Sequence, residues 1–181
     1  TQGFYNDSIG TLLNGTNPVV DDNAVNTFLF PNNNSNPNDP SIAAAPEPDL
    51  SAAAGVLGNW LGDPGNLNAN WSGPQAIPGG WAVNSETAIV YEIDAGPTGI
   101  SGLTADFGVD NGIFVWLNGS FVGGQMAPGG PVLGELMLSL GNLAAGTHYL
   151  QVLREDHGGG TGYGVLVEGD IGVIPVPAAL P

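Results

Sequence analysis

The stretch FGVDNGIFVWLNGSFV, residues 107–122, decides the fold. Its segment Ile113–Asn118 (IFVWLN) places alternate side chains on opposite faces, which is the two-residue period of a β-strand. Asn118–Gly119 favours the type I′ turn that joins two antiparallel strands through two residues. Phe121–Val122 then begins a returning strand, so this stretch predicts a β-hairpin.

Strands of the same period flank this hairpin at intervals of roughly ten residues. Short strands separated by Gly- and Pro-rich turns are typical of an antiparallel sandwich, and no fixed repeat indicates a solenoid or propeller. We therefore expect a mainly β chain, an antiparallel β-sandwich or jelly roll. The predicted strands are Phe4–Leu13, Ala88–Asp94, Ile100–Phe107, Ile113–Asn118, Leu133–Leu140, Thr147–Arg154 and Tyr163–Glu168.

The chain divides into three predicted segments. Residues 1–48 are extended and turn-rich, and they either join the sandwich or reach into another chain as an assembly arm. Asp49 is a suitable N-cap, and the apolar side chains after it follow helical spacing, which predicts one short helix near residues 50–61. The sandwich domain takes residues 49–170, and the Pro-rich residues 171–181 form an exit linker.

The charge balance excludes two classes of partner. Seventeen acidic residues and one Arg give a formal net charge of −16. Such a chain cannot bind nucleic acid by neutralising phosphates, and it offers no basic patch to anionic lipid headgroups. A hydrophobic content of 42% nevertheless predicts a folded chain rather than a disordered acidic tail. No run of about 18 apolar residues occurs, so no membrane-spanning segment is predicted.

The ligand chemistry of the chain favours calcium over other metals. Cysteine is absent and only two His occur, which excludes thiolate sites and three-His centres. Oxygen ligands are plentiful, and bound cations would relieve the repulsion among the acids. The candidate ligands are Asp110, Asn111, Asp21 and Asp22. For Asp110 and Asn111 the alternative is a turn, because their side chains readily satisfy local backbone donors.

The densest polar cluster is formed by Arg154, Glu155, Asp156 and His157, followed by the glycines 158–160. One interpretation is a ligand loop at an end of the sandwich, in which Arg holds sugar hydroxyls and Asp and His complete the hydrogen bonds. The alternative is structural: Arg154 neutralises acids at the strand end, and the glycines form the turn.

A second candidate for ligand binding lies on the hairpin. Trp116, Phe114 and Asn118 share the face opposite Ile113, Val115 and Leu117 by the strand period. An exposed Trp116 would stack on the apolar face of a pyranose ring, with Asn118 beside it. Alternatively, a loop such as residues 60–81 covers Trp116.

Sequence motifs for catalysis are missing. The chain contains no G-x-S-x-G nucleophile elbow and no glycine-rich phosphate loop that opens a helix. Its glutamates have no spacing that pairs two carboxylates in a cleft, as glycoside hydrolysis requires. We therefore expect a protein that is not an enzyme.

Residues 88–168 resemble a known fold family. The segments AIVYEID, FGVDNGIFVWLNG and AGTHYLQVLREDHGGGTGYGVLVEG are similar to the galactose-binding-like jelly roll of many secreted bacterial proteins. The resemblance covers nearly half of the chain. It implies the sandwich fold and leaves the ligand open.

The tail Val173–Pro181 (VIPVPAALP) resembles the start of a PEP-CTERM sorting signal, with Val176 in place of the usual Glu. That family is handled by an exosortase in Gram-negative bacteria, and its signal continues into a transmembrane helix and a basic cluster. The resemblance implies a secreted or cell-surface protein of the extracellular matrix.

Two functions follow from these expectations. In the first, the sandwich binds a matrix polysaccharide, with calcium as the stabilising ion. In the second, copies of the chain assemble into an extracellular fibre or biofilm matrix, and cations screen the net charge of −16. The expected partners are therefore polysaccharide or copies of the protein itself.

Overall fold

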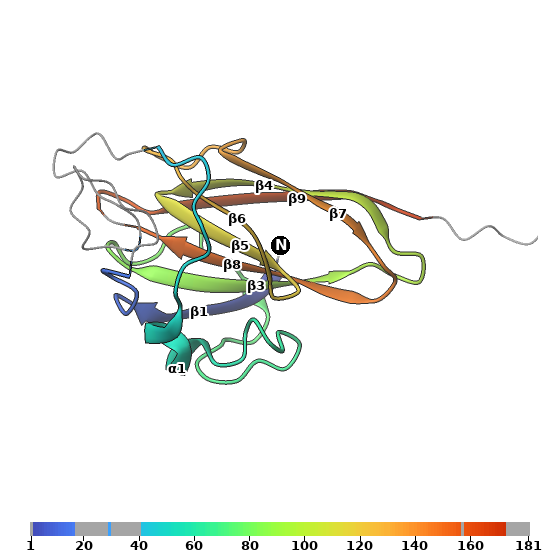
Figure 1. Ribbon diagram of the computed structural model, residues 1–181, viewed down its shortest axis with the longest axis horizontal. Coiled ribbons are helices and arrows are strands. Elements are labelled where there is room, and N and C mark those ends of the chain that lie inside the picture. Colours follow the sequence, from blue (N-terminus) through green and yellow to red (C-terminus); the bar gives the residue numbers. More distant parts are fainter. Residues whose placement is uncertain (1, 17–28, 30–40, 157, 173–181) are drawn as a thin grey trace, which may run out of the picture.

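The computed structural model describes residues 2–16, 29, 41–156 and 158–172, and these residues form a β-sandwich (Figure 1). One sheet has six strands in the order β2-β1-β3-β8-β5-β6, and the other has three in the order β7-β4-β9. All strand pairings among the described residues are antiparallel, so the predicted fold class is confirmed. The strands are β1 (Gln2–Gly10), β2 (Gln75–Ala76), β3 (Glu86–Asp94), β4 (Ile100–Asp110), β5 (Gly112–Leu117), β6 (Ser120–Met126), β7 (Leu136–Leu143), β8 (Thr147–Glu155) and β9 (Gly162–Ile171).

The predicted hairpin is present between β5 and β6. Leu117 pairs with Ser120, and Asn118 and Gly119 have φ values of 50° and 77°. Positive φ at both central residues is the requirement of a type I′ turn. Gly119 also lies against the backbone carbonyl of Leu61, where a Cβ atom would collide with the carbonyl oxygen. The turn therefore docks closely on a neighbouring loop.

The first hydrophobic core, which we call the inner core, fills the space between the two sheets. Every strand from β3 to β9 contributes alternate side chains to it, as the two-residue period predicts. Full burial of each such side chain contributes about 1.5–3 kcal/mol relative to exposure. Its most deeply buried members include Ile89, Phe107, Ile113, Val115, Leu150 and Val152.

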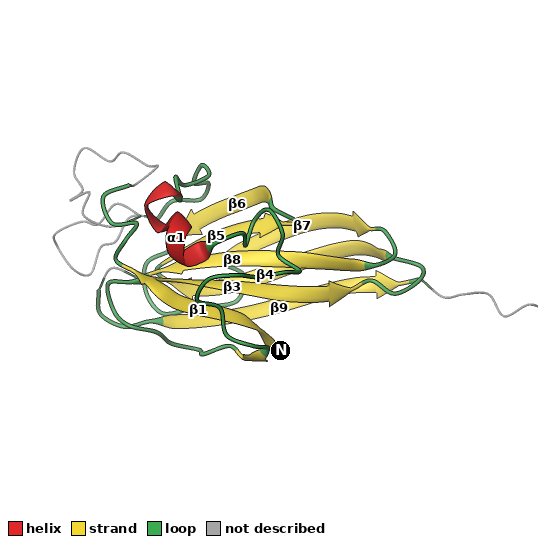
Figure 2. Ribbon diagram, turned by 90° about the horizontal axis from the view of Figure 1, so that it is seen from below, coloured by secondary structure: helices red, strands yellow, loops and turns green. Residues whose placement is uncertain are grey.

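The second core, which we call the outer core, lies on the far face of the six-stranded sheet. A 3₁₀ turn (Ser51–Ala53), helix α1 (Ala54–Leu57) and the loop after it cover that face, as Figure 2 shows from the helix side. Because both faces of the sheet are covered, β8 is buried continuously from Leu150 to Glu155. Its members with essentially no exposure include Leu57, Trp60, Ala88, Val90, Phe114, Trp116 and Leu153.

Several predicted boundaries differ from those observed. The helix is shorter than residues 50–61, because Gly58 adopts φ 61° and ends it after one turn. The strand predicted at Leu133–Leu140 is β7, three residues later. The residues before β7 form a loop across the outer face of the three-stranded sheet, where Gly134 N–H donates to Asp106 Oδ1 at 2.6 Å.

The described part of residues 1–48 belongs to the chain's own sandwich. Strand β1 lies between β2 and β3, and Ile42 forms a β-bridge with Met126 of β6. Ala45 N–H donates to the carbonyl of Gly124, also on β6, at 2.8 Å. These residues therefore complete the six-stranded sheet from both sides. At the other end of the chain, β9 continues through Ile171, into the segment predicted as linker.

We predict that alanine is costlier at Gly119 than at Gly141. The two glycines have nearly equal φ, 77° and 76°, but a Cβ at Gly141 meets nothing within 4 Å. The left-handed conformation alone costs an alanine about 1–2 kcal/mol, and the collision with Leu61 adds about 1–3 kcal/mol at Gly119. Urea unfolding of G119A and G141A measures both losses. Equal losses would show that the loop at Leu61 moves away freely.

Candidate functional site

The cluster predicted around Arg154 is a buried arginine enclosed by aromatic rings. Arg154 points between the sheets and has no exposed surface. Its Cζ atom lies 4.2 Å from the ring centroid of Trp81, 4.8 Å from that of Tyr163 and 5.6 Å from that of Tyr5. Nε donates to Thr87 Oγ1 at 3.0 Å, and an Nη donates to a backbone carbonyl. The guanidinium is thus held by rings and neutral oxygens rather than by the carboxylates that the structural alternative expected.

Burial sets the ionisation of this enclosure. It lowers the pKa of Arg154 and raises the pKa of Tyr91 and Tyr163. The Tyr91 hydroxyl also donates to that of Tyr163 at 3.1 Å. The tyrosines therefore stay neutral while the guanidinium keeps its charge, and attraction between the cation and the ring faces replaces an ion pair.

The residues after Arg154 do not join it in one ligand loop. Glu155 follows on the same strand, so its side chain points to the opposite face. Asp156 Oδ2 accepts from the backbone N–H groups of Asn84 at 2.7 Å and Gly158 at 3.1 Å, which ties down the turn. His157 lies outside the described residues. The structure therefore places Arg154 and Glu155 on opposite faces of β8 and uses Asp156 in the turn. Ligand binding by these residues stays a prediction.

Trp116 adopts the covered arrangement. It has no exposed surface, and Trp60 and Phe121 meet it edge-on at centroid distances of 5.3 and 5.4 Å. Trp71 stacks on Trp60 at 5.8 Å, so the segment 60–81 supplies the cover. The indole N–H donates to Glu47 Oε1 at 2.7 Å. Trp116 thus anchors the outer core and offers no ring face to a sugar.

Asn118 is exposed, but its side chain forms hydrogen bonds that hold the hairpin turn in place. Its Oδ1 accepts from Tyr149 N–H at 2.9 Å, and its amide nitrogen lies 3.0 Å from His148 Nδ1. These contacts fix the turn against the neighbouring strand. The side chain's hydrogen-bonding groups are therefore engaged within the protein.

Of the four candidate calcium ligands, only Asp110 and Asn111 lie among the described residues. Asp110 ends β4, and Asn111 is 2% exposed in the turn before β5, where its N–H donates to Glu155 O at 3.0 Å. Asp21 and Asp22 lie outside the described residues. Over the described ranges, no three His, Asp or Glu side chains gather as a metal-binding group. Calcium binding stays a prediction of the charge balance.

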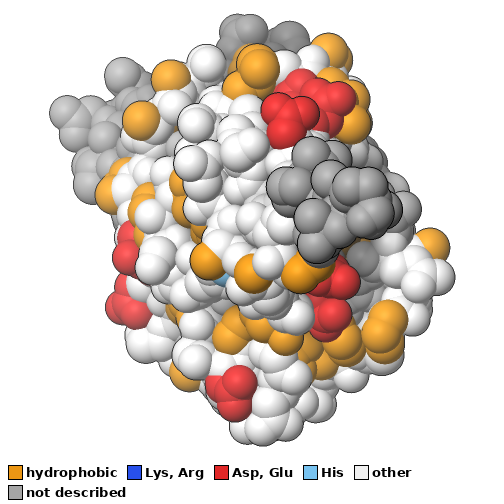
Figure 3. Space-filling view, turned by 90° about the vertical axis from the view of Figure 1, so that its right-hand side faces the viewer, with side chains coloured by type: hydrophobic (Ala, Val, Ile, Leu, Met, Phe, Trp, Pro, Cys, Tyr) orange, Lys and Arg blue, Asp and Glu red, His pale blue; other side chains and the backbone are white. Residues whose placement is uncertain are grey.

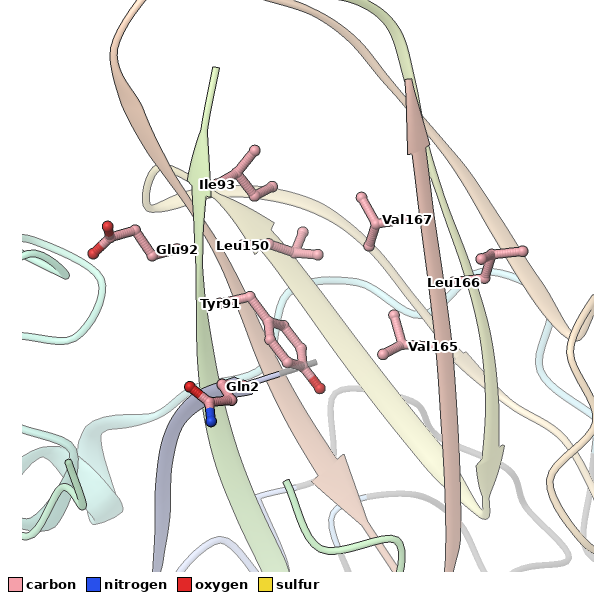
Figure 4. A pocket seen from close by; sticks show the side chains of 8 residues that line it. All are labelled: Gln2, Tyr91, Glu92, Ile93, Leu150, Val165, Leu166 and Val167. Carbon is pink, nitrogen blue, oxygen red and sulfur yellow. The ribbon is translucent and has the colours of Figure 1, made fainter. Parts of the chain in front are cut away.

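A cavity that the sequence did not predict opens between the sheets. Its volume is about 310 Å³, and we call it the β3–β9 slot. Figure 4 shows Tyr91, Ile93, Leu150, Val165 and Val167 pointing into it, whereas Glu92 and Leu166 point away. The side chains that point into the slot are therefore mainly apolar, and the acidic side chain of Glu92 lies outside it.

The slot lies on a side of the sandwich that is closed near Arg154 and open further along β9. Near Arg154, Trp81 N–H donates to Thr161 Oγ1 at 2.9 Å, and that hydroxyl donates to Trp81 O at 3.0 Å. This contact joins the loop before β3 to the start of β9 and plugs the gap with Trp81. Further along β9 no such plug is found among the described residues. Pairing order and loop placement create the slot, and neither has a local signal in the sequence.

No protein-family model matches this chain, and no curated protein matches it in sequence. Within the described ranges, no helix has the length and apolar character that crossing a membrane requires. The geometry of the chain's own residues is therefore the basis for proposing a function.

We predict that native protein resists trypsin. The chain has no Lys, so its only cleavage site follows Arg154, which is buried in the central strand β8. Cleavage therefore requires opening of the sandwich, and it yields only the fragments 1–154 and 155–181. Electrophoresis and mass spectrometry after digestion with and without urea check this. Rapid native cleavage would mean that β8 opens locally.

We also predict that Arg154→Lys destabilises the fold. Lysine keeps the positive charge but loses the planar group that stacks on Trp81 and Tyr163. The loss should be about 2 kcal/mol, the worth of a desolvated cation–π contact. Urea unfolding measures it. Unchanged stability would show that the rings only fill space around the cation.

Proposed function

We propose that this protein is a non-catalytic, secreted or cell-surface structural subunit that assembles with copies of itself. Assembly occurs by addition of an extended segment at the free edge of β9. The observation that supports the proposal is the combination of this edge with the apolar slot directly beside it. The proposal keeps the matrix location expected from the sequence and includes calcium or salt as a requirement.

The edge of β9 has the chemistry that strand addition uses. In the described sheets β9 pairs with β4 only, so its other side presents unpaired backbone N–H and C=O groups. An added strand would complete these hydrogen bonds and place alternate side chains into the slot against Val165 and Val167. A volume of about 310 Å³ suits a few aliphatic side chains. The incoming segment is therefore expected to be extended and apolar at alternate positions.

The charge around the edge makes this assembly conditional. Glu168 and Asp170 lie exposed on β9, and Glu92 and Asp94 lie exposed on β3. Figure 3 shows carboxylates and apolar side chains on one end of the molecule and no Lys or Arg there. Charges at a sheet edge oppose uncontrolled pairing, and salt at physiological strength screens them beyond about 8 Å. Assembly should therefore strengthen with ionic strength or with calcium.

The two residues on which the expectation of polysaccharide binding mainly rested are not accessible to a ligand in this structure. Trp116 and Arg154 carried that expectation, and both are fully buried. A second copy is the better-supported partner, because the open edge and the slot are surface features. Retention on a matrix polysaccharide is one outcome that the experiment below distinguishes.

We predict that Val167→Glu abolishes self-association and that Leu166→Glu leaves most of it. Both variants add one negative charge to the same edge strand, but only residue 167 points into the slot (Figure 4). Light scattering and sedimentation at 10 and 300 mM NaCl, and at low salt with calcium, follow the mass of each protein. Electron microscopy identifies fibres.

Three results would contradict the proposal. The first is a monomer under all these conditions, and the second is equal loss of association in both variants. The third is retention of the monomer on polysaccharide that neither variant weakens. Thermal unfolding of each variant controls for a general loss of stability.

A further inference from the structure

Glu86 is a buried acidic residue whose burial the sequence did not predict. It begins β3 and lies directly opposite Glu155, the last residue of β8. Both residues are 0% exposed. The next pair on the same face of the sheet is Ala88, two residues after Glu86, and Leu153, two residues before Glu155. Both belong to the outer core. By the strand period, the two carboxyl groups therefore also point into the outer core, where opposite Cβ atoms are about 4.5–5.5 Å apart.

The surroundings of Glu86 favour its neutral form. Neither of its carboxyl oxygens has a hydrogen-bond partner that meets normal geometry. Burial and then the charge of Glu155 raise the pKa of Glu86 from 4.5 to about 8, and the nearby backbone N–H groups of Glu86 and Leu13 oppose this shift only partly. An ionised carboxylate without strong donors is costly in such a place.

Among the described residues, the charged groups around the pair include no cation. Asp156 follows Glu155 on β8, and Asp110 ends β4 near the turn that contacts Glu155. On the flanking strands, β1 and β5 place Gly10 and Gly112 in register with the pair, and the Asp7 side chain of β1 is exposed. The outer core contributes apolar side chains such as Leu13. Arg154, the only Arg of the chain, points to the opposite face of β8 and stacks on Trp81.

We propose that Glu86 is a neutral carboxylic acid in the folded protein, and that its proton acts as a pH-sensitive lock between β3 and β8. Loss of this proton places a negative charge beside Glu155 inside the outer core. The sheet is then weakened at its end, next to the Arg154–Glu155 peptide bond. Mild alkali therefore loosens the sandwich, and mild acid tightens it.

The direction of the pH dependence follows from the pKa of Glu86 in the two states. Since burial and the charge of Glu155 raise its folded pKa to about 8 from an ordinary 4.5, the folded state holds the proton more tightly. The stabilisation is complete below pH 4.5 and is lost as pH rises to about 8. One proton changes the unfolding equilibrium constant by up to about tenfold per pH unit in this window.

The test compares wild type with Glu86→Gln and Glu92→Gln between pH 5 and 9.5. Glutamine mimics the protonated acid, so E86Q should unfold with nearly constant stability in this range and exceed wild type by at least tenfold in folding equilibrium at pH 8. E92Q, which changes an exposed acid on the same strand, should follow wild type. Urea unfolding gives the equilibrium constants, and the rate of trypsin cleavage after Arg154 reports the opening of β8 from pH 7 upward.

A second measurement stands apart from the variants. The carboxyl ¹³C shift of Glu86 in wild type should titrate with a midpoint above pH 7. Ionisation of Glu86 already at pH 6 would overturn the proposal, as would equal pH profiles of wild type and E86Q. It would also be overturned if calcium chloride stabilised wild type and not E86Q, because that result identifies a cation rather than a proton as the neutralising partner.

Discussion

Burial of β8 on both faces is the constraint on which the rest of the structure depends. A strand that is covered on one face only can expose its polar side chains to water on the other face. In β8, every residue from Leu150 to Glu155 is buried. Each polar side chain in that run therefore needs an environment built for it. Gln151 bridges Gly119 N–H and Trp60 O, Arg154 lies among aromatic rings, and Glu155 faces Glu86.

The outer layer over the six-stranded sheet results from the same constraint. Phe114 and Trp116 bring large rings to the face that points away from the three-stranded sheet. Water would meet these rings if the sandwich had only two layers, and the loss of their burial would cost several kcal/mol. The one-turn helix, the Trp60–Trp71 loop and Glu47 cover them. Segments without regular structure thus become as necessary to stability as the strands.

The sequence predicted those parts of the structure that depend on local patterns. The two-residue period located the main strands, and Asn118–Gly119 located the hairpin. The sequence left open whether Trp116 is exposed or covered, because periodicity assigns a residue to a face of the sheet and does not say what covers that face. Glu86 and the slot were missed because both arise from strands that are distant in the chain.

The Arg154 cluster shows a different limit. Arg154, Glu155 and Asp156 are adjacent in the chain, which suggested one polar site. The period that was applied to the hairpin also holds for β8, and it sends successive side chains to opposite sides of the sheet. The sequence predicts that this strand ends at Arg154, so the period does not extend to Glu155; because β8 runs one residue further, the two side chains lie on opposite sides of the sheet. The period also does not supply the aromatic enclosure, since Tyr5, Trp81 and Tyr163 come from three distant segments.

Enclosure of the only arginine leaves a surface whose described part carries acidic side chains and neither Lys nor Arg. Such a molecule behaves in suspension like a charged colloid, in which every orientation of approach is repulsive at long range. Ionic strength then acts as a threshold, below which copies stay dispersed at any orientation and above which short-range shape decides contact. Under the proposed self-assembly, the salinity of the medium alone would therefore decide where the protein condenses, with no change in the chain.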